Sequence, residues 1–169
     1  MSDLEIRDAD LSNPRHAEAI VAQLDAYARD PVASATGRGL SEEVKRDVVP
    51  GLRAHPGTHV FLAYRGDSAI GIAVCFLGFS TFAARRLLNV HDLAVVPEER
   101  GKGVGRRLLA RAEEKARELG CCKLTLEVQE HNARAQRLYT HFGFAAYELA
   151  SEAGRALFWQ KKLVAGQPQ

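Results

Sequence analysis

Cysteine is scarce in this chain, and its positions fit no framework. The 169 residues include only Cys75, Cys121 and Cys122. An odd number of cysteines, two of them adjacent, argues against a set of disulfide bonds. No spacing of cysteine and histidine fits a zinc site. We therefore expect three reduced thiols, a cytoplasmic location and no metal ion.

Long apolar segments and a large net charge are absent as well. No apolar run is long enough to cross a bilayer, and the opening MSDLEIRDAD is acidic and lacks the apolar centre of a signal peptide. A net charge of +2 gives no strong overall attraction to nucleic acid or to a membrane. We expect neither as a partner, so any anion-binding site must be local.

Repeats, low-complexity segments and an interdomain linker are also missing. We therefore expect one domain over residues 1–165, followed by a tail at residues 166–169. Apolar residues recur with the periods of strands and helices, and Pro50 is expected to end or kink its helix. This order of elements indicates an α/β domain with a mixed sheet. The predicted strands cover residues 4–10, 58–65, 68–80, 87–97, 122–128, 144–149 and 155–163, and the predicted helices cover residues 13–30, 42–55, 104–119 and 132–143.

The segment RGKGVGRRLL, residues 100–109, places glycine at every second position just before a predicted helix. The first amides of a helix have no acceptor within the helix, so they can bind an anion such as a phosphate. Glycine removes the Cβ atom, and phosphate oxygens can then approach these amides closely. Four basic side chains add positive charge around the loop. They are Arg100, Lys102, Arg106 and Arg107.

Two common nucleotide-binding motifs do not fit this loop. A P-loop requires GxxxxGK[ST], which the chain lacks, and the Rossmann motif GxGxxG requires a third glycine where Arg106 stands. Both motifs also follow the first strand of a βαβ unit, whereas this loop follows several strands. A flexible solvated turn is the alternative interpretation.

The string RGKGVG, directly after LAVVPEE, resembles the acyl-CoA pyrophosphate loop of the GCN5-related N-acetyltransferase (GNAT) superfamily. The later segment LEVQEHNARAQRLYTHFGF resembles the fifth strand, the asparagine-led helix and the Y…GF ending of the same family. The resemblance is strong from Leu88 to Phe144 and extends to the whole chain by element order. It implies an α/β fold (α+β in some schemes) with about four helices and a mixed, mostly antiparallel sheet of six to seven strands. The fourth and fifth strands are expected to splay apart.

The resemblance implies an N-acetyltransferase that transfers an acetyl group from acetyl-CoA to a primary amine of a small molecule. Such proteins often dimerise, so a homodimer is a possible assembly. The pantetheine arm would pair with the fourth strand, the loop would hold the pyrophosphate, and Asn132 would contact the pantetheine or only cap its helix. The implied cofactor-binding residues are Leu93, Ala94, Val95, Arg100, Gly101, Lys102, Gly103, Val104, Gly105, Arg106, Asn132 and Tyr139.

Tyr139 lies two helical turns after Asn132. At the matching position the family often has a tyrosine near the thioester sulfur, which acts as a general acid for the leaving thiolate. The alternative is an aromatic core residue, because Tyr139 also belongs to the apolar stripe of its helix, with Leu138 and Phe142 as neighbours.

The attacking amine must lose a proton, since an alkylamine of pKa ~10.4 is neutral in only about one molecule in a few thousand at pH 7. His91, Asp92 and Glu127 are the candidate acceptors, directly or through water. The segment NVHDLAVVPEERGKG resembles a subgroup that acetylates diamines and polyamines, but that subgroup has Glu-Asp in place of His91-Asp92. Because side chains alternate along a strand, at most one of these two is expected to point into a given face.

Two other classes of function stay open. A non-catalytic acyl-CoA-binding or regulatory module would keep the loop and need no proton donor or acceptor. A nucleic-acid binder would use the basic stripe of Arg106, Arg107 and Arg111, although no aromatic residues interleave with it.

Overall fold

The computed structural model describes residues 3–32, 37–146 and 159 of the chain. This part contains five strands, four α-helices and one short 3-10 turn at Pro97–Glu99. The strands are β1 (Leu4–Asp8), β2 (Thr58–Arg65), β3 (Ser68–Ser80), β4 (Arg85–Val95) and β5 (Leu124–Leu126). The helices are α1 (Pro14–Arg29), α2 (Glu42–Ala54), α3 (Val104–Glu118) and α4 (Ala133–Phe142).

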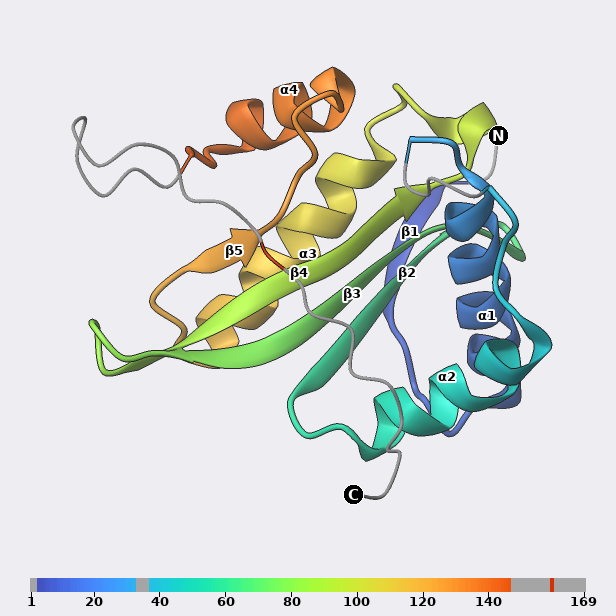
Figure 1. Ribbon diagram of the computed structural model, residues 1–169, viewed down its shortest axis with the longest axis horizontal. Helices are drawn as coiled ribbons and strands as arrows, with labels where there is room; N and C mark the ends of the chain where they lie inside the picture. Colours follow the sequence, from blue (N-terminus) through green and yellow to red (C-terminus); the bar gives the residue numbers. More distant parts are fainter. Residues whose placement is uncertain (1–2, 33–36, 147–158, 160–169) are drawn as a thin grey trace, which may run out of the picture.

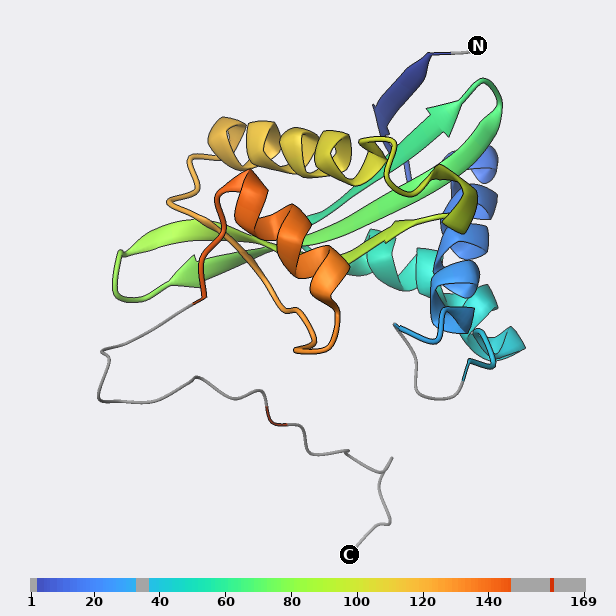
Figure 2. The ribbon, with the colours of Figure 1, turned by 90° about the horizontal axis from the view of Figure 1, so that it is seen from above.

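The five strands form one sheet between two layers of helices. Their order is β1-β2-β3-β4-β5, and all neighbours are antiparallel except β4 and β5. Helices α1 and α2 cover one face, with Ile20 and Ile72 in the core beneath them, and α3 and α4 cover the other, with Leu88 and Leu108 (Figure 1, Figure 2). The predicted mixed, mostly antiparallel sheet with four helices is confirmed.

The predicted number of six to seven strands is not matched, because the sheet has five strands in the part that the structure describes. Residues 144–146, expected to begin the sixth strand, are not extended into the sheet. The remainder of that strand and, apart from Trp159, all of the strand predicted at 155–163 lie outside the described residues. Strand β5 is also shorter than the predicted range of 122–128.

Strands β4 and β5 pair over only part of their course. Their parallel register runs from Leu88 opposite Leu124 to Val90 opposite Leu126, whereas β4 continues along β3 as far as Val95. The edge of β4 from residue 91 to 95 is therefore not paired with β5. The predicted divergence of the fourth and fifth strands is confirmed, and it accounts for the end of β5 at Leu126.

An irregularity of β4 at His91 changes which side chains face each layer. The consecutive β3 residues Val74 and Cys75 lie opposite Asp92 and Val90, so His91 is an additional residue in β4. The β4 side chains that pack on the α3 layer are Leu88, Val90, Leu93 and Val95. Val90 and Leu93 face the same layer although they are three residues apart, so the two residues between them, His91 and Asp92, both lie on the α1 side. Strict alternation, which would separate the two, therefore fails here.

Helix α2 begins at the expected place and runs past Pro50. The hydroxyl of Ser41 accepts a hydrogen bond from the Val44 amide, and the helix ends only at Ala54. Proline removes the N–H that would bond to the carbonyl of Arg46. Pro50 and Arg46 are both exposed, so water can bind that carbonyl. Of the two expected effects of Pro50, the end of the helix is therefore wrong, and a kink stays a prediction.

Candidate functional site

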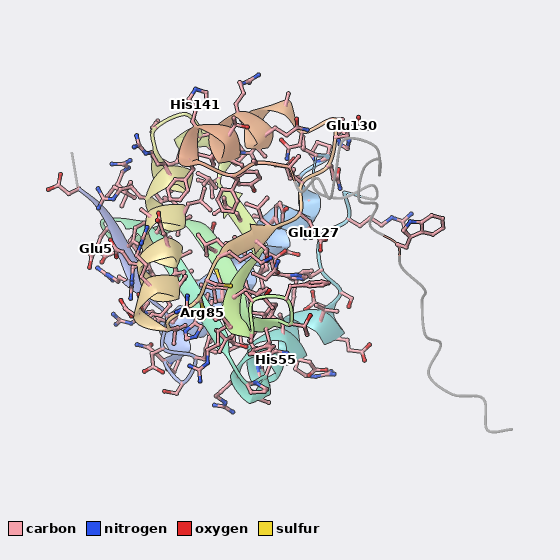
Figure 3. The ribbon with its side chains drawn as sticks, turned by 90° about the vertical axis from the view of Figure 1, so that its left-hand side faces the viewer. Glu5, His55, Arg85, Glu127, Glu130 and His141 are labelled. Carbon is pink, nitrogen blue, oxygen red and sulfur yellow. The ribbon has the colours of Figure 1, made fainter. Side chains whose placement is uncertain are left out.

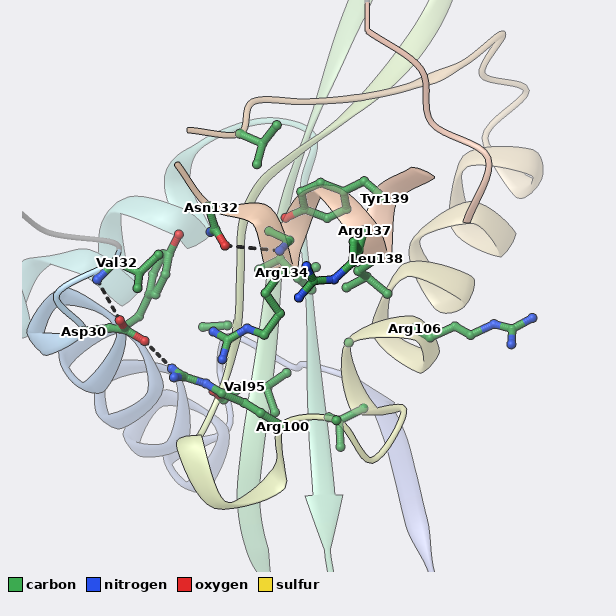
Figure 4. Close-up of a pocket in the computed structure, with 18 of the residues that line it drawn as sticks. Asp30, Val32, Val95, Arg100, Arg106, Asn132, Arg134, Arg137, Leu138 and Tyr139 are labelled. Carbon is green, nitrogen blue, oxygen red and sulfur yellow. Dashed lines mark hydrogen bonds and ion pairs between the residues drawn. The ribbon is translucent and has the colours of Figure 1, made fainter. Parts of the chain in front are cut away.

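A cavity of about 890 Å³ opens where β4 and β5 part. The end of α1, the free edge of β4, the start of α3, the segment after β5 and helix α4 line it (Figure 4). Its size suits a ligand of a few dozen atoms. The predicted site residues in its wall are His91, Leu93, Ala94, Val95, Arg100, Gly101, Gly103, Val104, Gly105, Arg106, Glu127, Asn132 and Tyr139. Asp92 and Lys102 are the two predicted residues outside this wall.

The glycine loop presents the first turn of α3 to the cavity. Gly101 and Gly103 have φ values of 78° and 83°, a region that glycine adopts without strain. Gly103 caps α3, and its carbonyl accepts the Arg107 amide at 3.1 Å. The amides of residues 104–106 precede this bond and have no acceptor within the helix. A Cβ atom on Gly101 or Gly103 would meet no other atom within 4 Å, so both positions border open space.

Gly105 has a different role from the other two glycines. A Cβ atom at this position would lie 3.0 Å from Cδ2 of Leu138 in α4 and 3.9 Å from Cγ2 of Val95. Glycine therefore allows α3 to pack closely against α4 and β4. This contact fixes the distance between the loop and the helix that carries Asn132 and Tyr139.

The basic side chains of the loop do not converge on the first turn of α3. Arg100 donates from Nε to the Val95 carbonyl at 2.9 Å and from Nη2 to Asp30. Lys102 is paired with Glu99 at 3.2 Å, and Arg106 extends away from Arg100 (Figure 4). The loop therefore offers backbone amides more directly than side-chain cations.

The free edge of β4 offers backbone groups to the cavity. The Val96 amide donates to the Ile70 carbonyl of β3 at 3.0 Å, and residues alternate in direction along an antiparallel pair. Leu93 and Val95 therefore direct their backbone groups away from β3. The hydrogen bond from Arg100 to the Val95 carbonyl agrees with this assignment.

The three candidate proton acceptors occupy different positions. His91 and Glu127 line the cavity, and Glu127 lies at the end of the β5 segment (Figure 3). The ring of His91 is 5.3 Å from the ring of Phe76, edge to face. Asp92 lies outside the cavity wall. Burial raises the pKa of its carboxyl group, and the charge of His91 opposes this rise. Of these three candidates, His91 and Glu127 therefore have direct access to the cavity.

Two tyrosines from opposite walls approach the cavity. Tyr139 of α4 packs edge to face on Phe144 at 5.9 Å, and burial raises the pKa of its phenol to about 12, with a further contribution from Tyr27. Burial also raises the pKa of Tyr27 at the end of α1, as do the charges of Asp92 and Asp30. Tyr139 is therefore both a core residue and part of the cavity wall.

Asn132 caps its helix and also lies in the cavity wall. Its side-chain oxygen accepts the Ala135 amide at 3.1 Å and so caps α4, and the residue also lines the cavity. Gly143 ends the same helix in the left-handed conformation, with φ 106°, as the pattern predicted.

Several wall residues were missed by the sequence analysis. Tyr27, Asp30 and Val32 come from the end of α1, and Arg134, Arg137 and His141 come from α4. The three α4 residues recur at intervals of three and four, so the sequence could have predicted that they share one face of the helix. No local signal joins α1 to the loop at residues 100–103, because about 70 residues separate them.

Two basic residues of α3, Arg107 and Arg111, bind groups of the protein itself, which bears on the nucleic-acid alternative. Arg111 is engaged with Asp8, Glu114 and Glu118, and Arg107 reaches the Leu4 carbonyl. No group of three or more His, Cys, Asp or Glu side chains among the described residues is placed to hold a metal ion. None of the described helices is long and apolar enough to cross a membrane.

Comparison with known proteins identifies relatives of the chain. A family model described as the acetyltransferase (GNAT) family matches residues 20–144. YhfO of Bacillus subtilis, an uncharacterised N-acetyltransferase, is 35% identical over 85 residues, which are 50% of this chain and 57% of that protein. Streptothricin acetyltransferase of Streptomyces lavendulae is 36% identical over 120 residues, covering 66% and 61%. Thialysine N-epsilon-acetyltransferase of Bos taurus is 33% identical over 79 residues, covering 47% and 46%. The chain thus spans about half to three fifths of these proteins.

Solved structures share the fold over nearly the whole chain. A probable acetyltransferase superposes with a TM-score of 0.76 at 20% identity, covering 94% of this chain and 99% of that one. An aminoglycoside N-acetyltransferase in complex with CoA gives a TM-score of 0.74 at 19% identity, covering 96% and 97%.

Proposed function

The chain belongs to the acetyltransferase (GNAT) family, and on that premise we propose that it is an acetyl-CoA-dependent N-acetyltransferase acting on a primary amine of a small molecule. One observation carries the proposal. The amides at the start of α3 and the unpaired edge of β4 line the same cavity. An anion-binding end and an extended-chain-binding edge are what a diphosphate joined to a pantetheine arm requires.

The residues in the wall fit this ligand. Open space at Gly101 and Gly103 leaves room for phosphate oxygens near the amides of residues 104–106. Leu93 and Val95 offer backbone groups to the amides of the arm, as an added strand would. Arg134 and Arg137 of α4 add positive charge on the opposite wall (Figure 4). When bound, acetyl-CoA supplies an acetyl group activated as a thioester.

The protein's own groups would then serve direct attack by the amine. A backbone N–H of β4 stabilises the negative charge on the carbonyl oxygen. His91 or Glu127 takes the amine proton, directly or through water, because both line the cavity and Asp92 does not. Tyr139, whose phenol has a pKa of about 12, stays protonated near neutral pH. It donates a hydrogen bond to the leaving sulfur. Full proton transfer to a thiolate of pKa ~8.5 is uphill, so its effect is charge stabilisation.

The choice of a small amine rests on the relatives. Three of them are named for the acetylation of thialysine, streptothricin and aminoalkylphosphonate, which are small molecules that carry an amine. The three cysteines are free thiols, and thiols persist in reducing compartments. This supports a cytoplasmic location for the activity.

The experiment measures release of free thiol from acetyl-CoA in the presence of a panel of amines. The panel contains diamines, polyamines, lysine analogues, aminoglycosides and aminoalkylphosphonates. We expect saturable release with at least one amine and a strong loss in the Tyr139→Phe variant. Saturable binding of acetyl-CoA without release by any amine would instead favour the non-catalytic binding module.

A further inference from the structure

The guanidinium of Arg100 is held away from the first turn of α3. Its Nε donates to the Val95 carbonyl at 2.9 Å, and its Nη2 donates to a carboxylate oxygen of Asp30. Figure 4 shows the side chain turned toward α1 rather than toward the helix that the glycine loop opens. The side chain of Arg100 is 25% exposed and that of Asp30 is 10% exposed, so the pair is largely shielded from water.

Asp30 is built into the end of α1. It caps the helix, with its amide bonded to the Tyr27 carbonyl at 3.0 Å, and its Oδ1 accepts the Val32 amide at 2.9 Å. Burial raises the pKa of its carboxyl, but the Val32 amide and the charges of Arg100 and Arg134 outweigh this and lower it. Asp30 is therefore a carboxylate at neutral pH.

A carboxylate in the wall of a cavity that binds a diphosphate repels the ligand, so its presence there calls for an explanation. Asp30 and Arg100 both line the cavity, and an arginine that binds a carboxylate can bind a phosphate by the same N–H groups. We propose that Asp30 is a positioning residue for Arg100. In the free protein, the Asp30 carboxylate accepts the hydrogen bond from the Arg100 guanidinium that a phosphate oxygen of CoA accepts in the complex. Arg100 thus exchanges one anion for another. This inference rests on the proposed function.

Arg134 makes such an exchange feasible. Its charge acts on Asp30, and Figure 4 shows Arg134 reaching from α4 toward the Arg100–Asp30 pair. Asp30 is thus not left without a cation when Arg100 turns to the phosphate. Because Asp30 ends α1, and Tyr27 stands one turn earlier in the cavity wall, the exchange also links occupancy of the cofactor end to the α1 wall.

The test is the affinity for CoA after Asp30→Asn. Asparagine keeps an oxygen for the Val32 amide but removes the charge that competes for Arg100. Isothermal titration should show CoA binding tighter by roughly twofold to fivefold, the upper part of the range for a single ion pair. Asp30→Glu, which keeps the charge, should not bind more tightly than the unmodified protein. Asp47→Asn removes a charge from exposed α2 and should leave the affinity unchanged.

Acetylpantetheine, which lacks the diphosphate, serves as the second ligand. Its affinity should be the same for the unmodified protein and for Asp30→Asn, because no phosphate is present to gain from Arg100. Unchanged or weaker CoA binding by a folded Asp30→Asn protein would overturn the inference and assign the pair a purely structural role. An equal gain for acetylpantetheine would overturn it too. Failure of the unmodified protein to bind CoA at all would instead contradict the proposed function.

Discussion

Gly105 and Leu138 are in such close contact that a Cβ atom on the glycine would lie 3.0 Å from Cδ2 of the leucine. The contact joins the first turn of α3 to the middle of α4. Its consequence is that the glycine loop and Tyr139 stand at a fixed distance across the cavity. The third glycine of the loop is thus required by packing, whereas the first two border the open cavity.

Gly105→Ala is expected to impair turnover more than stability. Alanine favours a helix by about 1 kcal/mol over glycine, while overpacking costs about 1–3 kcal/mol, so the net loss of stability is at most about 2 kcal/mol. The added methyl pushes Leu138 and shifts α4, and kcat/KM for acetyl-CoA should fall. Thermal unfolding and steady-state kinetics measure both effects. Unchanged kinetics in a folded variant would show that α4 does not depend on this contact.

Gly51→Ala provides the matched control. Gly51 lies within α2, and a Cβ atom there would meet nothing within 4 Å. Only the gain in helix propensity applies, so the free energy of unfolding should rise by about 0.5–1 kcal/mol. Turnover should stay the same because α2 does not line the cavity.

Gly103→Ala is expected to weaken cofactor binding. The φ of 83° is left-handed, and an L-residue pays about 1–2 kcal/mol there. The loop relieves this strain by moving, which displaces the α3 amides and raises KM for acetyl-CoA. Gly120→Ala carries a similar penalty at φ 68°, but it lies at the far end of α3. Unfolding should be affected alike in both variants, and only Gly103→Ala should alter KM.

Tyr139→Phe removes one hydroxyl and keeps the ring that packs on Phe144. If the phenol stabilises the charge on the leaving sulfur, kcat should fall by about 10²-fold or more, while the dissociation constant for CoA stays near that of the unmodified protein. Because the pKa of Tyr139 is about 12, its ionisation should not reduce kcat below about pH 10. Tyr64→Phe, at a tyrosine outside the cavity wall, is the control and should retain its rate. Equal rates for both variants would remove Tyr139 from the mechanism.

Asp92→Asn should change the pH dependence of stability. Burial raises the pKa of Asp92 in the folded protein, so the folded state binds more protons than the unfolded state between the ordinary pKa of ~3.9 and the higher folded value. The free energy of unfolding therefore falls as pH rises through this window, and asparagine abolishes that loss. In urea unfolding from pH 4 to pH 8, the free energy of unfolding of the variant should increase relative to that of the unmodified protein as pH rises. Parallel curves of unfolding free energy against pH for the two proteins would contradict a raised pKa of Asp92.

The sequence predicts what depends on neighbouring residues. The glycine loop, the cap at Asn132 and the stop at Gly143 were all recognisable because capping and left-handed turns depend on one or two residues. The pairing of Arg100 with Asp30 was not, since it joins residues 70 positions apart.

The bulge at His91 marks another limit. It depends on the register between β3 and β4, which only the assembled sheet sets. Alternation along β4 alone therefore assigned His91 and Asp92 to opposite faces. The C-terminal end of β5 was placed too late for a related reason: β5 ends where β4 diverges from it, although its own pattern continues to Val128.

The central claim is that the amides at the start of α3 bind the diphosphate of CoA. The most direct measurement is a titration of ¹⁵N-labelled protein with CoA, following the amide resonances of Val104, Gly105 and Arg106. We expect these three signals to shift in a saturable way, with Gly51 and Gly120 as unaffected references. Saturable binding that leaves the α3 amides unshifted, or no binding at millimolar CoA, would contradict the claim.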